Sequence, residues 1–188
     1  MIKKYLLAAI LAAPSTAFAQ ENKFHCPKVG TVLEFSTGAK TRVDAANGFE
    51  CDATNMTNGF KWTDHAYFQQ VKPLDSTNGA TDSVLRDLES FWPLVPGRVV
   101  EVTKNRGGSS YIHTYTAIGI EIVTVPAGTF QAWHLTARTR IVPSNSSAIH
   151  HYWWDPKLGV TVKRETVIER GQWTGIGQNL ELVAVKAP

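Results

Sequence analysis

The chain has 188 residues, of which 43% are hydrophobic and 19% are charged, with a formal net charge of +3. That length suits a domain with a sizeable core. Basic residues do not cluster with interleaved aromatic residues, so the composition gives no support for nucleic-acid binding. After the first 19 residues, no segment is long and apolar enough to cross a membrane.

Residues 1–19 have the pattern of a secretory signal peptide. Lys3 and Lys4 form a basic start, residues 5–13 form a short apolar core, and residues 17–19 (Ala-Phe-Ala) form a cleavage site. A membrane anchor is the alternative, but the apolar run falls short of the ~20 residues that a span needs. We therefore expect a mature chain from about Gln20, periplasmic or extracellular, with a single antiparallel β domain over residues 20–188.

Cys26 and Cys51 are the two cysteines of the chain. An even number of cysteines in an exported protein predicts a disulfide, and closing this loop contributes about 3 kcal/mol in the chain-entropy model. Two unpaired thiols are one alternative. A metal site that combines both thiols with the neighbouring His25 is another.

Short strands separated by turn residues dominate the sequence up to residue 71. Asn47-Gly48 is a strong two-residue hairpin signal, and alternating apolar positions mark the strands. A helix is predicted at residues 82–91, capped by Thr81 or Asp82, with Leu85, Leu88 and Trp92 at helical spacing. The strands expected before and just after this helix are residues 31–36, 39–45, 49–56, 60–71 and 98–104.

Residues 111–140 contain two long β-patterned runs that meet at a Pro-Ala-Gly-Thr turn, residues 126–129. If Val125 faces Phe130, residues 118–122 place their isoleucines against the apolar residues of 133–137 on a buried face. The opposite face then pairs Glu121 with His134. This register predicts that both strands bury the same apolar side.

A second hairpin is predicted from residues 148–154 and 160–169, with Trp154 facing Val160 and Tyr152 facing Val162. A glycine-rich turn at residues 171–177, which holds Trp173, and a closing strand at residues 179–186 follow. With nine or ten strands and one helix, we expect a mainly β fold. Its single antiparallel sheet curls into a half-barrel or barrel, with the short helix packed on it.

Three runs carry a resemblance to a known group: FWPLVPG at residues 91–97, VPAGTF at 125–130, and YWWDPKLGVTVK at 152–163. Together they resemble a broad group of uncharacterised exported bacterial β-proteins, a domain of unknown function. These proteins combine a VPAGTF turn with a YWxDPxLGVxVK hairpin. The resemblance implies a curled antiparallel sheet, loosely similar to the half-barrels of periplasmic lipoprotein carriers. It implies no catalytic residues.

Catalytic and metal-binding patterns are weak in the sequence. His150 and His151 are strand neighbours and point to opposite faces, so they cannot hold one metal together. In the register above, His134 faces Glu121, which reads as a surface pair. No Gly-x-Ser-x-Gly motif is present. We therefore expect no catalytic residues, no metal, no cofactor and no enzymatic activity.

Aromatic residues are more numerous than a small core requires, and a curled sheet can line a pocket with them. The leading hypothesis is a periplasmic protein that binds or carries a hydrophobic ligand, either a lipid or a lipidated partner. The alternatives are a non-catalytic envelope module that contacts another envelope protein, and a hydrolase without a recognisable motif. The candidate ligand-lining residues are Trp62, Trp92, Trp133, Tyr152 and Trp154.

Overall fold

The computed structural model describes residues 22–72, 81–172 and 179–188. Within these residues, eleven strands form one antiparallel sheet in the order β5-β4-β3-β2-β1-β11-β10-β9-β8-β7-β6, accompanied by one helix. The elements are β1 (Val32–Phe35), β2 (Lys40–Asn47), β3 (Glu50–Asn55), β4 (Lys61–His65), β5 (Gln69–Lys72), α1 (Asp82–Ser90), β6 (Val99–Arg106), β7 (Ser109–Val125), β8 (Gly128–Val142), β9 (Ser146–Asp155), β10 (Val160–Arg170) and β11 (Leu180–Lys186).

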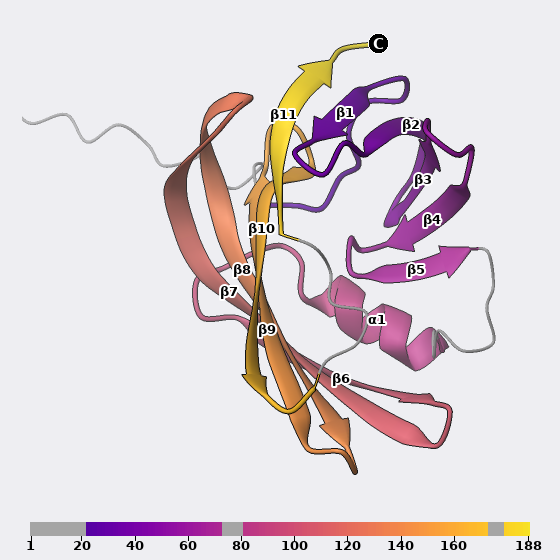
Figure 1. The fold of residues 1–188 in the computed structure, drawn as a ribbon, viewed down its shortest axis with the longest axis vertical. Helices are drawn as coiled ribbons and strands as arrows, with labels where there is room; N and C mark the ends of the chain where they lie inside the picture. Colours follow the sequence, from indigo (N-terminus) through magenta and orange to yellow (C-terminus); the bar gives the residue numbers. More distant parts are fainter. Residues whose placement is uncertain (1–21, 73–80, 173–178) are drawn as a thin grey trace, which may run out of the picture.

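The predicted fold class is confirmed: the chain is mainly β, with a single curled antiparallel sheet and one helix (Figure 1). The sheet is open, because β5 and β6 each have a strand neighbour on one side only. Helix α1 connects these two edges along the chain and packs most closely on β6. The strand count is slightly higher than the expected nine or ten.

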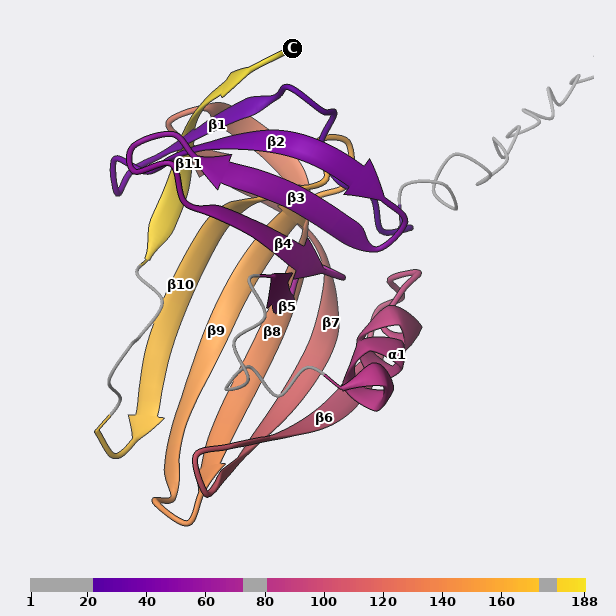
Figure 2. The same cartoon turned by 90° about the vertical axis from the view of Figure 1, so that its right-hand side faces the viewer.

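Pairing between the first and last strands joins the two halves of the sheet. Val32 faces Lys186 and Phe35 faces Leu182, so β1–β5 and β6–β11 become one continuous sheet. Figure 2 shows β1, β2 and β3 running across the upper ends of the long strands β7–β10. The sheet therefore bends over itself and creates a concave space beneath its N-terminal half.

One predicted strand, residues 60–71, is two strands. Ala66 and Tyr67 adopt left-handed backbone conformations, with φ of +48° and +74°, and the chain turns there from β4 into β5. Neither residue is a glycine, so turn chemistry gave no signal of this reversal. Packing stabilises it instead: Ala66 is completely buried, and the neighbouring Phe68 contacts Tyr115 at a ring distance of 4.6 Å.

The helix forms where the sequence predicts it. The Thr81 hydroxyl accepts a hydrogen bond from the backbone N–H of Val84 at 3.4 Å, which caps the first turn. Val84 and Leu88 are buried against the sheet, whereas Leu85 is only half-buried. A nine-residue helix is marginal in isolation, so its packing on the core is what stabilises it.

The predicted register of the β7–β8 hairpin is wrong. Val125 faces Gly128 rather than Phe130, because Pro126 and Ala127 alone form the turn. A further shift occurs between Ala117 and Gly119, where β7 carries an extra residue.

Burial on β7 differs from the prediction because, near the turn, the other side of the strand is the packed one, where Val123 and Val125 join the second core cluster. The β8 prediction holds, since Trp133 and Leu135 are 2% and 0% exposed. The β7 prediction fails, since Ile118, Ile120 and Ile122 are 47%, 39% and 79% exposed. Below the bulge, Tyr115 and Ala117 fill the buried side of the strand.

The predicted β9–β10 register is also wrong. Trp154 faces Thr161, and after a bulge Tyr152 faces Arg164 instead of Val162. An extra residue in β10 between Thr161 and Lys163 explains the offset.

Some predictions lie outside the described residues. These are the signal peptide at 1–19 and the part of the glycine-rich turn that contains Trp173. Within the described ranges, the helix is too short to cross a membrane. The closing strand is confirmed as β11.

Candidate functional site

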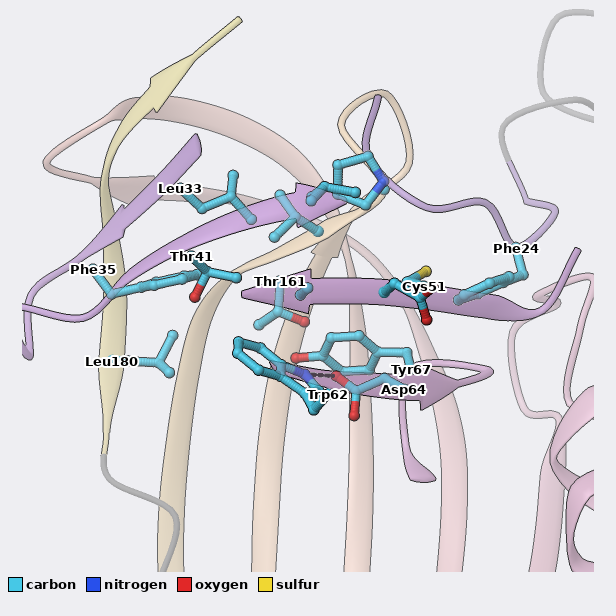
Figure 3. Close-up of a pocket in the computed structure, with 16 residues that line it drawn as sticks. Phe24, Leu33, Phe35, Thr41, Cys51, Trp62, Asp64, Tyr67, Thr161 and Leu180 are labelled. Atoms are coloured by element: carbon cyan, nitrogen blue, oxygen red, sulfur yellow. Dashed lines mark hydrogen bonds between the residues drawn. The ribbon is translucent and has the colours of Figure 1, made fainter. Parts of the chain in front are cut away.

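An apolar cavity lies between the N-terminal strands and the start of β10 (Figure 3). Its volume is about 150 Å³. A cavity of about that size in another protein binds benzene, so this one has room for a single ring or the end of an alkyl chain. Its walls include Leu33, Val43, Ala53, Trp62, Val160 and Leu180.

The strand register determines which side chains form the apolar wall of the cavity. Val43 faces Ala53 across β2 and β3, and Ala53 faces Trp62 across β3 and β4. Directly facing residues of an antiparallel pair share one side of the sheet, so these three side chains form a row. The row lines the cavity together with Val160 and Leu180, which come from the other half of the sheet.

A carboxyl group stands in this apolar wall. Asp64 lies two residues after Trp62 on β4 and therefore on the same face. The Trp62 indole N–H donates a hydrogen bond of 2.8 Å to Asp64 Oδ2 (Figure 3). Burial nevertheless dominates and raises the pKa of Asp64 to about 6.

Tyr67 and Thr161 also belong to the polar part of the lining, as do Thr41 and Asp52. Burial raises the pKa of the Tyr67 phenol well above its usual range, so its hydroxyl stays protonated. Thr161 is almost completely buried and lies next to Tyr67 (Figure 3). The cavity is thus mainly apolar, with a few hydrogen-bonding groups placed on its wall.

The N-terminal segment closes one end of the cavity. Cys51 and Pro27 both line it, and the sulfur atoms of Cys26 and Cys51 lie at disulfide-bonding distance, with a Cα–Cα separation of 5.7 Å. His25 Nε2 lies 2.7 Å from the backbone oxygen of Pro156. These contacts attach the segment to β3 on one side and to the β9–β10 turn on the other.

The five aromatic residues expected to line a ligand site lie in two places. Trp62 lines the cavity. Trp92, Trp133 and Trp154 are 7%, 2% and 0% exposed and belong to the core beneath the helix, and Tyr152 packs against that core. Trp92 and Trp154 meet there at a ring distance of 4.8 Å.

Sequence reasoning missed Asp64, Tyr67 and Thr161. The alternation Trp62-x-Asp64 was a usable signal, because it puts an acid beside an aromatic ring on one strand face. Nothing local marked Tyr67 or Thr161, since they meet only through the bend of the sheet.

Histidines occupy both faces of the long hairpins. His134 Nδ1 lies 2.9 Å from Glu121 Oε1, the contact that the sequence suggested, and its Nε2 lies 2.9 Å from His151 Nδ1. The pKa of Glu121 is lowered, chiefly by the hydrogen bond from the Trp153 indole. Within the described ranges, no three His, Cys, Asp or Glu side chains are arranged to hold a metal ion.

One histidine and one threonine are arranged like a general base and a nucleophile. His113 Nδ1 lies 2.9 Å from the hydroxyl of the buried Thr139. Burial, followed by the nearby charge of Lys104, lowers the pKa of His113 to about 3. A general base works best when its pKa is near the operating pH, so this imidazole is a poor base for hydrolysis.

The fold belongs to a class of open, strongly curled antiparallel sheets that carry a short helix. No protein-family model and no curated protein sequence matches the chain. Among solved structures, the hypothetical lipoprotein YmcC from Escherichia coli K12 superimposes with a TM-score of 0.50 at 12% sequence identity, covering 87% of this chain and 88% of YmcC. At that identity, the likeness shows the fold alone.

Two further structures are similar in outline. A Bacteroides fragilis protein described as exported and as having a YmcC-like fold gives a TM-score of 0.47 at 16% identity, covering 88% of this chain and all (100%) of that one. A Parabacteroides distasonis protein described as a lipoprotein gives 0.39 at 15% identity, covering 87% and 99%. The descriptions of all three neighbours place them among exported proteins or lipoproteins.

Proposed function

We propose that this protein is an exported, non-enzymatic binder of a hydrophobic ligand, and that the ligand enters the cavity beneath β2–β4. The observation that carries the proposal is the apolar row of Val43, Ala53 and Trp62 around a space of about 150 Å³. Binding sites for small molecules are typically concave and apolar, with a few placed polar groups, and Asp64 and Tyr67 fit that description.

The volume of the cavity limits what enters. A space of benzene size holds one ring or the end of one chain, and cannot enclose a lipid with several acyl chains. The ligand is therefore a molecule that inserts one apolar end and leaves the remainder outside. Export is supported by the pattern of residues 1–19 and agrees with the descriptions of the structural neighbours.

Filling the cavity tests the proposal. Ala53 lines it, so Ala53→Leu adds a side chain that occupies the space; Ala46→Leu makes the same change at an exposed position of β2. With 1-decanol as the probe and Trp fluorescence or calorimetry as the readout, we expect Ala53→Leu to weaken binding at least tenfold. Ala46→Leu should bind as the wild type does. Equal affinities for all three proteins, or no binding to the wild type, would refute the proposal.

A second candidate function is an envelope protein-interaction module. The observation that favours it is the row of Ile118, Ile120 and Ile122, which stays 39–79% exposed on β7. Exposed apolar patches often mark protein contacts. If this candidate is correct, Ile122→Thr should abolish a contact seen by crosslinking in the cell envelope while leaving decanol binding and melting unchanged.

A further inference from the structure

A second cavity adjoins the first. Its volume is about 380 Å³, and Pro27 and Leu33 line both spaces. The N-terminal segment, the β9–β10 turn and the last residues of the chain, including Val185, form its walls. A ligand that enters the first cavity therefore has a larger space directly beside it.

The charged side chains around this second cavity are all basic. Of the described residues that line it, Lys28 and Lys157 carry the full positive charges, and no Asp or Glu side chain is among them; Pro188, which carries the carboxylate at the end of this chain, also lines it. Both lysines are exposed, and within the described part of the chain neither takes part in a salt bridge. Their ammonium groups can turn toward a bound anion at little cost.

His25 connects the N-terminal segment to the β9–β10 turn beside this space. Its Nδ1 lies 3.0 Å from the backbone oxygen of Cys26, and its Nε2 lies 2.7 Å from the backbone oxygen of Pro156.

Gly159 permits this close approach. A Cβ at that position would lie 2.6 Å from the His25 backbone oxygen and 2.7 Å from its Nδ1. The backbone there also has a φ of +69°, which glycine adopts without strain. The β9–β10 turn can therefore lie against His25.

We infer that the ligand is a single-chain anionic amphiphile, whose apolar end fills the first cavity and whose acidic head lies in the second, beside Lys28 and Lys157. This inference rests on the proposed function, because it needs the first cavity to hold the apolar end. The first cavity has room for one alkyl chain of the ligand. The lysines of the second cavity favour an anionic head group over a neutral one.

Two probes of equal chain length, decanoate and 1-decanol, separate the head from the tail. An exposed ion pair contributes up to ~1 kcal/mol, and ~1.4 kcal/mol corresponds to a factor of ten. We expect decanoate to bind about three- to tenfold more tightly than decanol at low salt. Because exposed charges are screened, this preference should shrink toward unity at ~0.5 M salt.

Charge-removing variants give the decisive comparison. The double variant Lys28→Gln/Lys157→Gln should lose the preference for decanoate and keep the wild-type affinity for decanol. The control Lys61→Gln/Lys72→Gln removes the same charge from exposed lysines that line neither cavity, and should keep the preference.

The outcomes separate the two proposals. If decanol and decanoate bind equally well and the double variant changes nothing, the inference about the head is wrong while the proposed function stands. If neither probe binds, the proposed function itself fails. If the protein sediments with phosphatidylglycerol vesicles and does not bind decanoate, the ligand is a bilayer surface and the single-chain inference is wrong.

Discussion

Replacing Asp64 by asparagine should stabilise the protein. Asp64 lies in the apolar wall of the first cavity, where the Trp62 indole N–H donates a hydrogen bond to its carboxylate. Burial raises its pKa from 3.8 to about 6, so at pH 7 the folded protein holds a charge in unfavourable surroundings. Asparagine has nearly the same shape and its carbonyl can still accept the bond from Trp62, but it carries no charge.

The size of the effect follows from the pKa. One pKa unit corresponds to about 1.4 kcal/mol, so the displacement of Asp64 corresponds to at most about 3 kcal/mol at neutral pH. Burying the asparagine N–H₂ group costs part of this. We therefore expect Asp64→Asn to raise the free energy of unfolding by about 1 to 3 kcal/mol at pH 7.

The pH dependence has a definite sign. Between pH 4 and 6 the folded protein keeps the Asp64 proton more tightly than the unfolded chain does, so stability falls as the pH rises through this window. Above pH 6 the loss is complete. The difference in unfolding free energy between Asp64→Asn and the wild type should therefore be small near pH 4, grow to its maximum by about pH 7, and then level off.

Urea unfolding followed by Trp fluorescence, at several values of pH from 4 to 8, measures this difference. Asp87→Asn, at an exposed position of the helix, is the control and should stay within about 0.5 kcal/mol of the wild type throughout. The reasoning is refuted if the Asp64→Asn difference does not change with pH, or if the variant is less stable than the wild type at pH 7.

Three other substitutions test the fold. Gly128 has a φ of +135°, so Gly128→Val should strain the β7–β8 turn and lower the unfolding free energy by about 1 to 3 kcal/mol, and unchanged urea unfolding would mean that the strain is absent. Replacing Cys26 and Cys51 together by serine should lower the unfolding free energy by about 3 kcal/mol relative to the wild type without reductant, and the wild type with reductant should match the variant. Leu88→Ala should lower the unfolding free energy by about 2 to 5 kcal/mol, because this helix side chain is completely buried in the core. Arg86→Ala, on the exposed face of the helix, should leave the melting temperature near the wild-type value.

Local patterns in the sequence were sufficient to predict most of the elements. The helix begins at Asp82 as predicted, because a capping threonine and an apolar repeat act within one or two turns of chain. Hairpin signals such as Asn47-Gly48 are equally local, and β2 and β3 meet there. The fold class followed because many short strands with short connections have few arrangements other than an antiparallel sheet.

The strand register was less predictable, because it depends on single inserted residues that no sequence pattern indicates. The bulges near Ile118 and Val162 each add one residue to one strand. A bulge needs no special residue type, so an apolar alternation that continues through it assigns the wrong neighbours. The isoleucines of β7 are exposed for a different reason: Ile120 does face Trp133, but near the turn the buried residues are Val123 and Val125 on the other side of the strand.

The candidate site depends on contacts that span the whole chain. Leu33 and Leu180 both line the first cavity, and they come close because β1 pairs with β11. Such a pairing between distant segments has no local signal, whereas the neighbouring hairpins are joined by turns of a few residues. The same pairing brings the β9–β10 turn beside the N-terminal segment, where His25 contacts Pro156. A cavity formed in this way has walls from both halves of the sheet, and no short stretch of sequence contains enough of those walls to predict it.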